Sequence, residues 1–141
     1  MASILLMEDD DQLRTMLRLL LTRSGHQVWA AANGTGACEL YQQQGFDLVI
    51  TDLVMPDVEG LEMIMDLRRI NQNVRIIAIS GGGQRGGKST AEEYLLIAQK
   101  LGAQLTLAKP FDNQEFLDAV SLVLESWAHT NPPRVFQWTR N

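Results

Sequence analysis

The alternation of short apolar runs with longer amphipathic stretches constrains the fold of this chain more than any other feature. A short apolar run bounded by polar residues is typical of a strand that is covered on both faces. Between the runs, apolar residues recur at helical spacing and mark the buried stripe of a helix. The five runs lie at residues 4–7, 28–31, 48–50, 74–79 and 105–108. The pattern therefore predicts five β-strands, each followed by a helix.

Glycines and capping residues predict where the helices begin and end. Asp112, with Glu115 three residues later, matches a capping box at the start of the fifth helix, whose stripe runs to Trp127. A similar spacing at residues 89–93 predicts the start of the fourth helix. Glycine is common just after a helix, and the first, second and fourth amphipathic stretches are followed by Gly25, Gly45 and Gly102.

The composition fits one globular domain in a reducing compartment. The chain has 141 residues, 45% of them hydrophobic, a formal net charge of −5 and a single cysteine. A chain of this length can bury a core without disulfides. We expect the domain to span residues 1–128, and residues 129–141, which lack periodicity, to form an irregular tail. No apolar run is long enough for a signal peptide or a membrane span, and the basic residues are scattered. We therefore expect a cytoplasmic protein that binds neither membrane nor nucleic acid.

Strand and helix units in this order predict an α/β fold with a parallel sheet and helices on both faces. Parallel strands need crossover connections, which place the helices on the faces of the sheet. Ligands of such sheets bind beyond the carboxyl ends of the strands. The residues that follow the first, third, fourth and fifth runs are the acids at 8–11, Asp52, Ser80 and Lys109.

Three carboxylates, a hydroxyl and an amine at one sheet edge predict a phosphoryl-transfer site. Glu8, Asp9 and Asp52 would repel one another unless a cation neutralises them, and Mg²⁺ prefers oxygen ligands and phosphate. The Lys109 ammonium and the Ser80 hydroxyl are suited to contact phosphoryl oxygens. Asp52 can serve as the nucleophile, as carboxylates do in aspartyl-phosphate chemistry.

These residues stand in motifs that closely resemble the receiver domain of two-component response regulators, of the chemotaxis type that stands alone. The resemblance covers residues 3 to about 127 and implies a flavodoxin-like, doubly wound (βα)5 fold with strand order 2-1-3-4-5. The motifs are Glu8-Asp9-Asp10, Asp52-Leu53-Val54-Met55-Pro56 with Gly60, Ser80, and Lys109-Pro110-Phe111.

The resemblance also implies a role for each site residue. Asp52 would be the phosphoacceptor, while Ser80 and Lys109 would contact the phosphoryl group. The bond between Lys109 and Pro110 would be cis. Asp9 would bind the metal directly and Glu8 through water, so that Mg²⁺ is held by Glu8, Asp9, Asp52 and the backbone carbonyl of Val54.

By this resemblance the chain is expected to be a single-domain response regulator without an output domain of its own. It would accept a phosphoryl group from a phosphohistidine of a sensor kinase or phosphotransfer protein and signal through contacts with a downstream protein. It would catalyse its own phosphorylation and dephosphorylation, although its role is signalling. Val54 and Gly82 occupy positions that the resemblance links to autodephosphorylation. Neither side chain can hold an attacking water, so we expect slow self-hydrolysis.

Two features depart from the usual receiver pattern. Receivers commonly carry an aromatic residue three positions before the lysine, and Thr106 stands there in this chain. The usual coupling of the hydroxyl to an aromatic ring therefore does not carry over. The segment between Ser80 and Lys109 is also longer than in most receivers. We hypothesise that the chain signals through an ordering change in residues 81–93.

Two other functions fit parts of the sequence. Residues Gly82–Ser89 match the G-x-x-x-x-G-K-[ST] pattern of a P-loop, in which Lys88 would contact the phosphates and Ser89 the Mg²⁺ of a nucleotide. Short patterns of this kind recur by chance in glycine-rich loops. The third possibility is a receiver-like module that binds partners without being phosphorylated, against which the complete set of site residues argues.

Several polar residues are expected to be structural. Asp10 and Asp11 precede a helix, where acids are favoured as caps and by the helix dipole. His26, His129 and Cys38 have no partners at ligand or catalytic spacing. We therefore expect none of these five residues to take part in chemistry.

Overall fold

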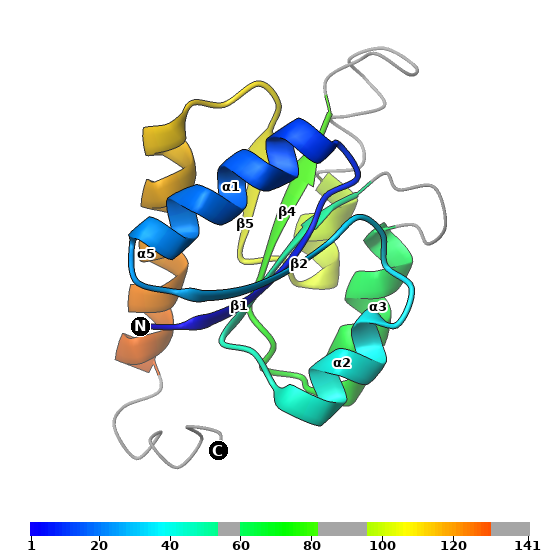
Figure 1. The fold of residues 1–141 in the computed structure, drawn as a ribbon. Helices are drawn as coiled ribbons and strands as arrows, with labels where there is room; N and C mark the ends of the chain where they lie inside the picture. Colours follow the sequence, from blue (N-terminus) through cyan, green and yellow to red (C-terminus); the bar gives the residue numbers. More distant parts are fainter. Residues whose placement is uncertain (54–59, 82–95, 131–141) are drawn as a thin grey trace.

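The predicted strands form one parallel sheet (Figure 1), and their order across the sheet is β2-β1-β3-β4-β5. The computed structural model describes residues 1–53, 60–81 and 96–130. The strands are β1 (Ser3–Met7), β2 (Gln27–Ala31), β3 (Leu48–Asp52), β4 (Ile76–Ser80) and β5 (Leu105–Ala108). The helices are α1 (Asp11–Arg23), α2 (Ala37–Gln44), α3 (Gly60–Ile70) and α5 (Asn113–Thr130), and residues 96–101 are also helical. The doubly wound α/β fold and the predicted strand order are confirmed.

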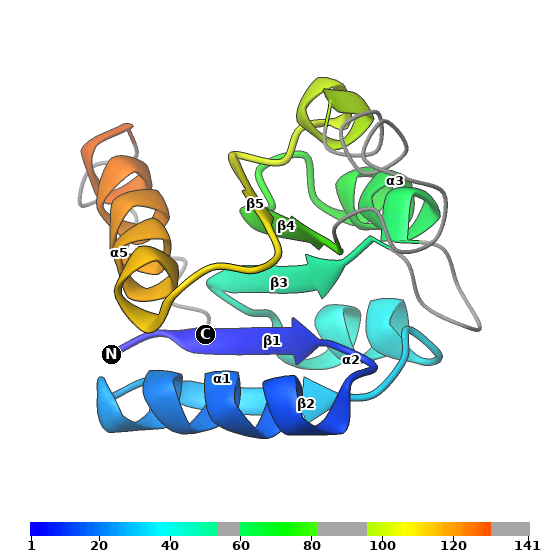
Figure 2. The same cartoon turned by 90° about the horizontal axis from the view of Figure 1, so that it is seen from above.

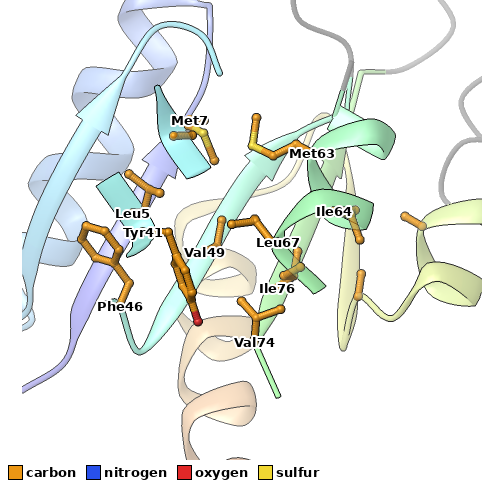
Figure 3. Close-up of a cluster of buried hydrophobic side chains, with 14 of the residues drawn as sticks. Leu5, Met7, Tyr41, Phe46, Val49, Met63, Ile64, Leu67, Val74 and Ile76 are labelled. Atoms are coloured by element: carbon orange, nitrogen blue, oxygen red, sulfur yellow. The ribbon is translucent and has the colours of Figure 1, made fainter. Parts of the chain in front are cut away.

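The helices cover both faces of the sheet, and each face has its own apolar core (Figure 2). Successive side chains of a strand point to opposite faces. In β1, Ile4 and Leu6 therefore pack with α1 and α5, whereas Leu5 and Met7 pack with α2 and α3. Figure 3 shows the second of these clusters, in which Leu5 and Met7 lie among side chains of α2, β3 and α3. This burial on both faces explains the continuous apolar runs.

Side chains at the helix starts behave as the capping pattern predicts. The Asp10 carboxylate accepts hydrogen bonds from the backbone N–H groups of Gln12 and Leu13, at 3.0 and 3.1 Å. Asp112 and Glu115 form a reciprocal capping box: each backbone N–H donates to the other's carboxylate, at 2.9 and 2.8 Å. These bonds satisfy backbone donors that have no partner inside the helix.

Some predicted boundaries shift by a few residues. The fourth run was expected to form a strand from Val74, but β4 begins at Ile76, because the Val74 N–H donates to the Asn71 carbonyl in a turn, at 3.1 Å. α5 continues to Thr130, into the segment expected to be irregular.

The expected start of the fourth helix and residues 131–141 lie outside the described residues, and the domain boundary at residue 128 stays a prediction. In the ranges that are described, no helix combines the length and apolar character that crossing a membrane requires.

Candidate phosphoacceptor and metal site

The parallel register brings four strand ends together at one edge of the sheet. Met7 at the end of β1 pairs with Thr51 of β3, next to Asp52, and Asp52 pairs with Ile79 of β4. Ser80 pairs in turn with Ala108 of β5, so Lys109 follows directly beyond the edge. The residues predicted from the strand ends are therefore neighbours in space.

Lys109 joins two of the acidic residues. Its Nζ atom lies 3.1 Å from Oε2 of Glu8 and 3.1 Å from Oδ2 of Asp52. The Glu8 side chain is fully buried and that of Asp52 is 4% exposed, whereas that of Lys109 is 24% exposed. A cation shared by two buried carboxylates offsets part of their mutual repulsion.

Burial and charge shift the pKa values of Glu8 and Lys109. Burial and the nearby Asp52 carboxylate raise the pKa of Glu8 to about 7. Burial by itself would lower the pKa of Lys109, but the Asp52 and Glu8 carboxylates outweigh it, so the pKa of Lys109 is raised. Lys109 is therefore a permanent cation at neutral pH, and Glu8 is the group of this pair that titrates there.

The three predicted carboxylates form a group that can hold a divalent cation. One oxygen from each of Glu8, Asp9 and Asp52 lies within 4.8 Å of the other two. Opposite ligands of Mg²⁺, each at about 2.1 Å, are about 4.2 Å apart, so this spacing suits the ion. Oε1 of Glu8 is buried and has no hydrogen-bond partner. A buried oxygen of this kind is costly unless a donor or a cation reaches it, and the donor set therefore fits Mg²⁺.

Ser80 and Lys109 are also linked through the backbone. The Lys109 N–H donates to the Ser80 carbonyl at 2.8 Å, and the bond between Lys109 and Pro110 is cis, as predicted. The Ser80 side chain is almost fully buried, and its hydroxyl donates to the Gly81 carbonyl at 3.4 Å. This distance is long for a bond between two oxygens, which makes the hydroxyl easy to redirect.

Gly60 supports the end of β3 through a close backbone contact. Its N–H donates to the Leu53 carbonyl at 3.0 Å. A Cβ atom at this position would lie 2.5 Å from the Asp52 carbonyl oxygen and 2.5 Å from Cα of Leu53. Both are backbone atoms that cannot move aside, so only glycine fits beside the candidate phosphoacceptor.

Arg14 is a residue near the site that the sequence analysis missed. Its Nη1 donates to the backbone carbonyl of Glu8 at 2.9 Å, and its Nη2 donates to Oδ1 of Asp11 at 2.7 Å. The spacing from Asp11 to Arg14 could have indicated the ion pair, because residues three apart are neighbours on a helix. No sequence pattern indicates the bond to the Glu8 carbonyl.

Three of the remaining residues singled out in the sequence lie in the described part of the chain, and the others lie outside it. His26 has a structural contact, since its Nδ1 accepts a hydrogen bond from the Ala2 N–H at 3.1 Å. Cys38 packs partly buried against the core, and burial raises the pKa of its thiol. Thr106 lies half-buried in β5. Val54, Gly82–Ser89 and the side chain of His129 lie outside the described residues.

Comparisons with known proteins agree with this arrangement. Residues 4–121 match the family model of the response regulator receiver domain. The chain is 31% identical over 121 residues to sporulation initiation phosphotransferase F of Bacillus subtilis and covers 92% of that protein, with 86% of this chain aligned. It is 33% identical to the chemotaxis protein CheY of Halobacterium salinarum, over 86% of this chain and 95% of that protein.

Other relatives are longer than this chain. The DNA-binding transcriptional regulator NtrC of Azospirillum brasilense is 36% identical over 89% of this chain, but the match covers 24% of NtrC. Similarity to such regulators is therefore limited to one part of them.

Solved structures share the same fold. A CheY-like receiver domain protein from Methanospirillum hungatei superposes with a TM-score of 0.79, at 20% identity, over 91% of this chain and 97% of that one. A two-component response regulator of the LuxR family from Aurantimonas has a TM-score of 0.75 at 28% identity, over 89% of this chain and 86% of that one. The family model matches residues 4–121, and Glu8, Asp9 and Asp52 lie close together as the site requires. This chain therefore belongs to the response regulator receiver domain family.

Proposed function

We propose that this receiver domain accepts a phosphoryl group on Asp52 and thereby acts as a phosphorylation-dependent signalling protein. The observation that carries the proposal is the position of the Lys109 ammonium, 3.1 Å from Asp52 Oδ2 at the carboxyl edge of the sheet. In the transfer, an Asp52 carboxylate oxygen forms a bond to phosphorus as the bond from phosphorus to the donor histidine nitrogen breaks. The electron pair of the broken bond stays on the histidine nitrogen. If the other ring nitrogen carries a proton, the imidazole leaves as a neutral group; if it does not, the imidazole takes a proton from solvent.

Each neighbouring residue has a role in this step. Lys109 keeps a positive charge beside Asp52 and is placed to contact a phosphoryl oxygen once Asp52 is modified. The Ser80 hydroxyl, held only by a long bond to the Gly81 carbonyl, can turn to donate to a second oxygen. Such charge stabilisation by prepositioned groups is the main catalytic effect in phosphoryl transfer.

The carboxylates of Glu8, Asp9 and Asp52 would hold Mg²⁺, together with the backbone carbonyl of Val54. Bound Mg²⁺ would neutralise charge on the phosphoryl oxygens during transfer. Glu8 fits this role through its buried Oε1 atom without a hydrogen-bond partner. Asp9, which is exposed, can approach the ion from the solvent side.

The proposed partners are a phosphohistidine on a sensor kinase or phosphotransfer protein and a downstream protein that distinguishes the phosphorylated form. The similarity to sporulation initiation phosphotransferase F and to CheY supports a signalling role of this kind. A cytoplasmic location, slow self-hydrolysis and a signal carried by ordering of residues 81–93 remain part of the proposal. No observation favours the P-loop or the non-phosphorylated module.

Intact mass spectrometry tests the proposal directly. The wild type would be incubated with acetyl phosphate and Mg²⁺, and we expect one phosphoryl adduct that does not form when EDTA is present during the incubation. Asp52→Asn should give no adduct. Asp66→Asn changes an exposed carboxylate of α3 that pairs with Arg69, and this control should be phosphorylated like the wild type.

If acetyl phosphate gives no adduct, a phosphohistidine donor would be used instead. Absence of an adduct with both donors would reject the proposed function and favour a receiver-like binding module. An adduct that survives in Asp52→Asn would assign the modification to another residue.

A further inference from the structure

We propose that Arg14 is a positioning residue. It holds the acidic loop, residues 8–10 between β1 and α1, in its metal-binding shape. The inference rests on the proposed function of the site, and it concerns a residue that, within the described part of the chain, has no hydrogen bond or ion pair with Asp52 or Lys109. Arg14 lies one turn into α1, on the same side as the acidic loop.

The Arg14 guanidinium spans the loop from one end to the other. Nη1 donates to the Glu8 carbonyl at 2.9 Å, and Nη2 donates to the Asp11 carboxylate at 2.7 Å. Its two anchor points therefore enclose Asp9 and Asp10. The planar guanidinium can make such a fork of bonds, whereas a lysine ammonium offers a point charge on a flexible stem.

Other bonds within the loop leave the Asp9 carboxylate for the metal. The Asp10 carboxylate caps α1, and the Asp10 N–H donates to Oε2 of Glu8 at 3.1 Å. The Glu8 carbonyl is occupied by Arg14. Within the described residues, Asp9 is the one loop acid whose side chain shows no hydrogen bond. Arg14 thus holds the chain on both sides of Asp9. Its bond to the Glu8 carbonyl fixes the backbone before Asp9, and its bond to the Asp11 carboxylate fixes the chain after it.

The exposure of Arg14 distinguishes it from an ordinary surface ion pair. Its side chain is 21% exposed, whereas Asp11 is 84% exposed. Arg69 and Asp66 on α3 form an ion pair with the same spacing and the same 2.7 Å distance, but there Arg69 is 70% exposed. Exposed pairs contribute little to stability. The difference lies in the bond to the Glu8 carbonyl, which draws Arg14 against the loop.

Electrostatics and positioning predict opposite effects of removing Arg14. A guanidinium near a cation site repels the ion, so its removal by charge alone would tighten Mg²⁺ binding. If Arg14 positions the loop, its removal weakens Mg²⁺ binding because the Asp9 carboxylate loses its fixed placement. Residues that orient metal ligands typically change metal affinity by about 10- to 100-fold, and we expect about 10-fold weaker binding for Arg14→Gln.

The experiment measures the Mg²⁺ dissociation constant by calorimetry in the full chain without a phosphoryl donor. Arg14→Gln and Arg14→Lys are compared with Arg69→Gln, which removes the matched ion pair on α3. We expect weaker binding in both Arg14 variants and unchanged binding in Arg69→Gln. Arg14→Lys keeps the positive charge but lacks the planar fork of donors. Weaker Mg²⁺ binding in this variant would therefore show that the hydrogen bonds matter, and not the charge alone.

Hydrogen exchange of the metal-free chain provides a readout that does not need Mg²⁺. The N–H groups of Asp10, Gln12 and Leu13 should exchange faster in Arg14→Gln than in the wild type, with no change in Arg69→Gln. Unchanged or tighter Mg²⁺ binding in Arg14→Gln would overturn the inference, and so would unchanged exchange in these groups. A wild type that binds no Mg²⁺ would instead reject the metal site, and the exchange data would then decide the role of Arg14 on its own.

Discussion

The Nζ atom of Lys109 lies 3.1 Å from Oδ2 of Asp52, although the two residues are 57 positions apart in the chain. The same ammonium lies 3.1 Å from Oε2 of Glu8. Lys109 is therefore the counter-ion of two buried acids in the metal-free chain, and the same residue faces the candidate phosphoacceptor. We therefore expect both the stability of this domain and the proposed phosphorylation of Asp52 to depend on this one cation.

Replacing Lys109 with methionine should destabilise the metal-free chain. The change leaves the Glu8 and Asp52 carboxylates buried without their cation, and breaking a buried ion pair from one side costs about 3–5 kcal/mol. We expect the loss measured by urea unfolding to be larger at pH 8 than at pH 5, because Glu8 can take up a proton at the lower pH. Lys100→Met, which changes an exposed lysine of the helical residues 96–101, should leave stability unchanged. An equal loss in both variants would contradict the role of Lys109.

The pH dependence of Mg²⁺ binding should report the titration of Glu8. Because the pKa of Glu8 is raised to about 7, the carboxylate is mostly protonated at pH 6 and mostly ionised at pH 8. A metal ligand must lose its proton, so Mg²⁺ affinity should rise by roughly 10-fold between these pH values. Calorimetry on the wild type and on Glu8→Gln measures the effect. A pH step of the same size in Glu8→Gln would assign it to another group.

Glu8 should also make the metal-free chain less stable as the pH rises. Its pKa in the folded chain, about 7, lies above the ordinary value of 4.5. Between these two pH values the folded chain keeps a proton on Glu8 that the unfolded chain has released. The stability associated with this group is therefore full below pH 4.5 and is lost as the pH rises through 7. Glu8→Gln should remove this decline and be more stable than the wild type at pH 8, by roughly 1–3 kcal/mol. Lower stability of Glu8→Gln at pH 8 would refute the assignment.

His26 should produce a pH effect of the opposite sign. Its Nδ1 accepts a hydrogen bond from the Ala2 N–H, and burial and the nearby amino terminus lower its pKa below 6.5. The folded chain therefore favours the neutral imidazole. The stability associated with His26 is present above pH 6.5 and is lost as the pH falls through its folded pKa. Thermal unfolding between pH 5 and 8 measures this effect. His26→Asn, whose Oδ1 atom can accept the same bond, should lack this loss on acidification.

Gly60→Ala should destabilise the end of β3. The added Cβ would lie 2.5 Å from the Asp52 carbonyl oxygen and 2.5 Å from Leu53 Cα, and overpacking of this kind costs about 1–3 kcal/mol. We also expect slower phosphorylation, because the backbone of Asp52 must shift. Gly81→Ala is the matched stability control, since a Cβ there meets nothing within 4 Å. Urea unfolding and the rate of adduct formation check both expectations. Equal stability of the two variants would show that β3 absorbs the added methyl group.

Local patterns were sufficient to predict the elements of this fold and the residue types at its functional edge. The apolar runs mark strands buried on both faces, and the helical stripes mark the covering helices, because each pattern depends on neighbours within a few residues. The capping box of Asp112 and Glu115 is local for the same reason. The parallel order of strand and helix units places Glu8, Asp52 and Lys109 at the same sheet edge. The strand order itself came from the family resemblance.

Only the tertiary structure decided how these residues interact. Lys109 and Glu8 are 101 positions apart, and their contact depends on how the whole sheet closes. The raised pKa of Glu8 follows from burial and from the distance to Asp52, neither of which is encoded in a short segment. The bond from Arg14 to the Glu8 carbonyl requires a particular path of the loop. By itself the sequence determined which chemical groups meet at the edge of the sheet, and three-dimensional packing determined their distances, their charges and the residue that holds them in place.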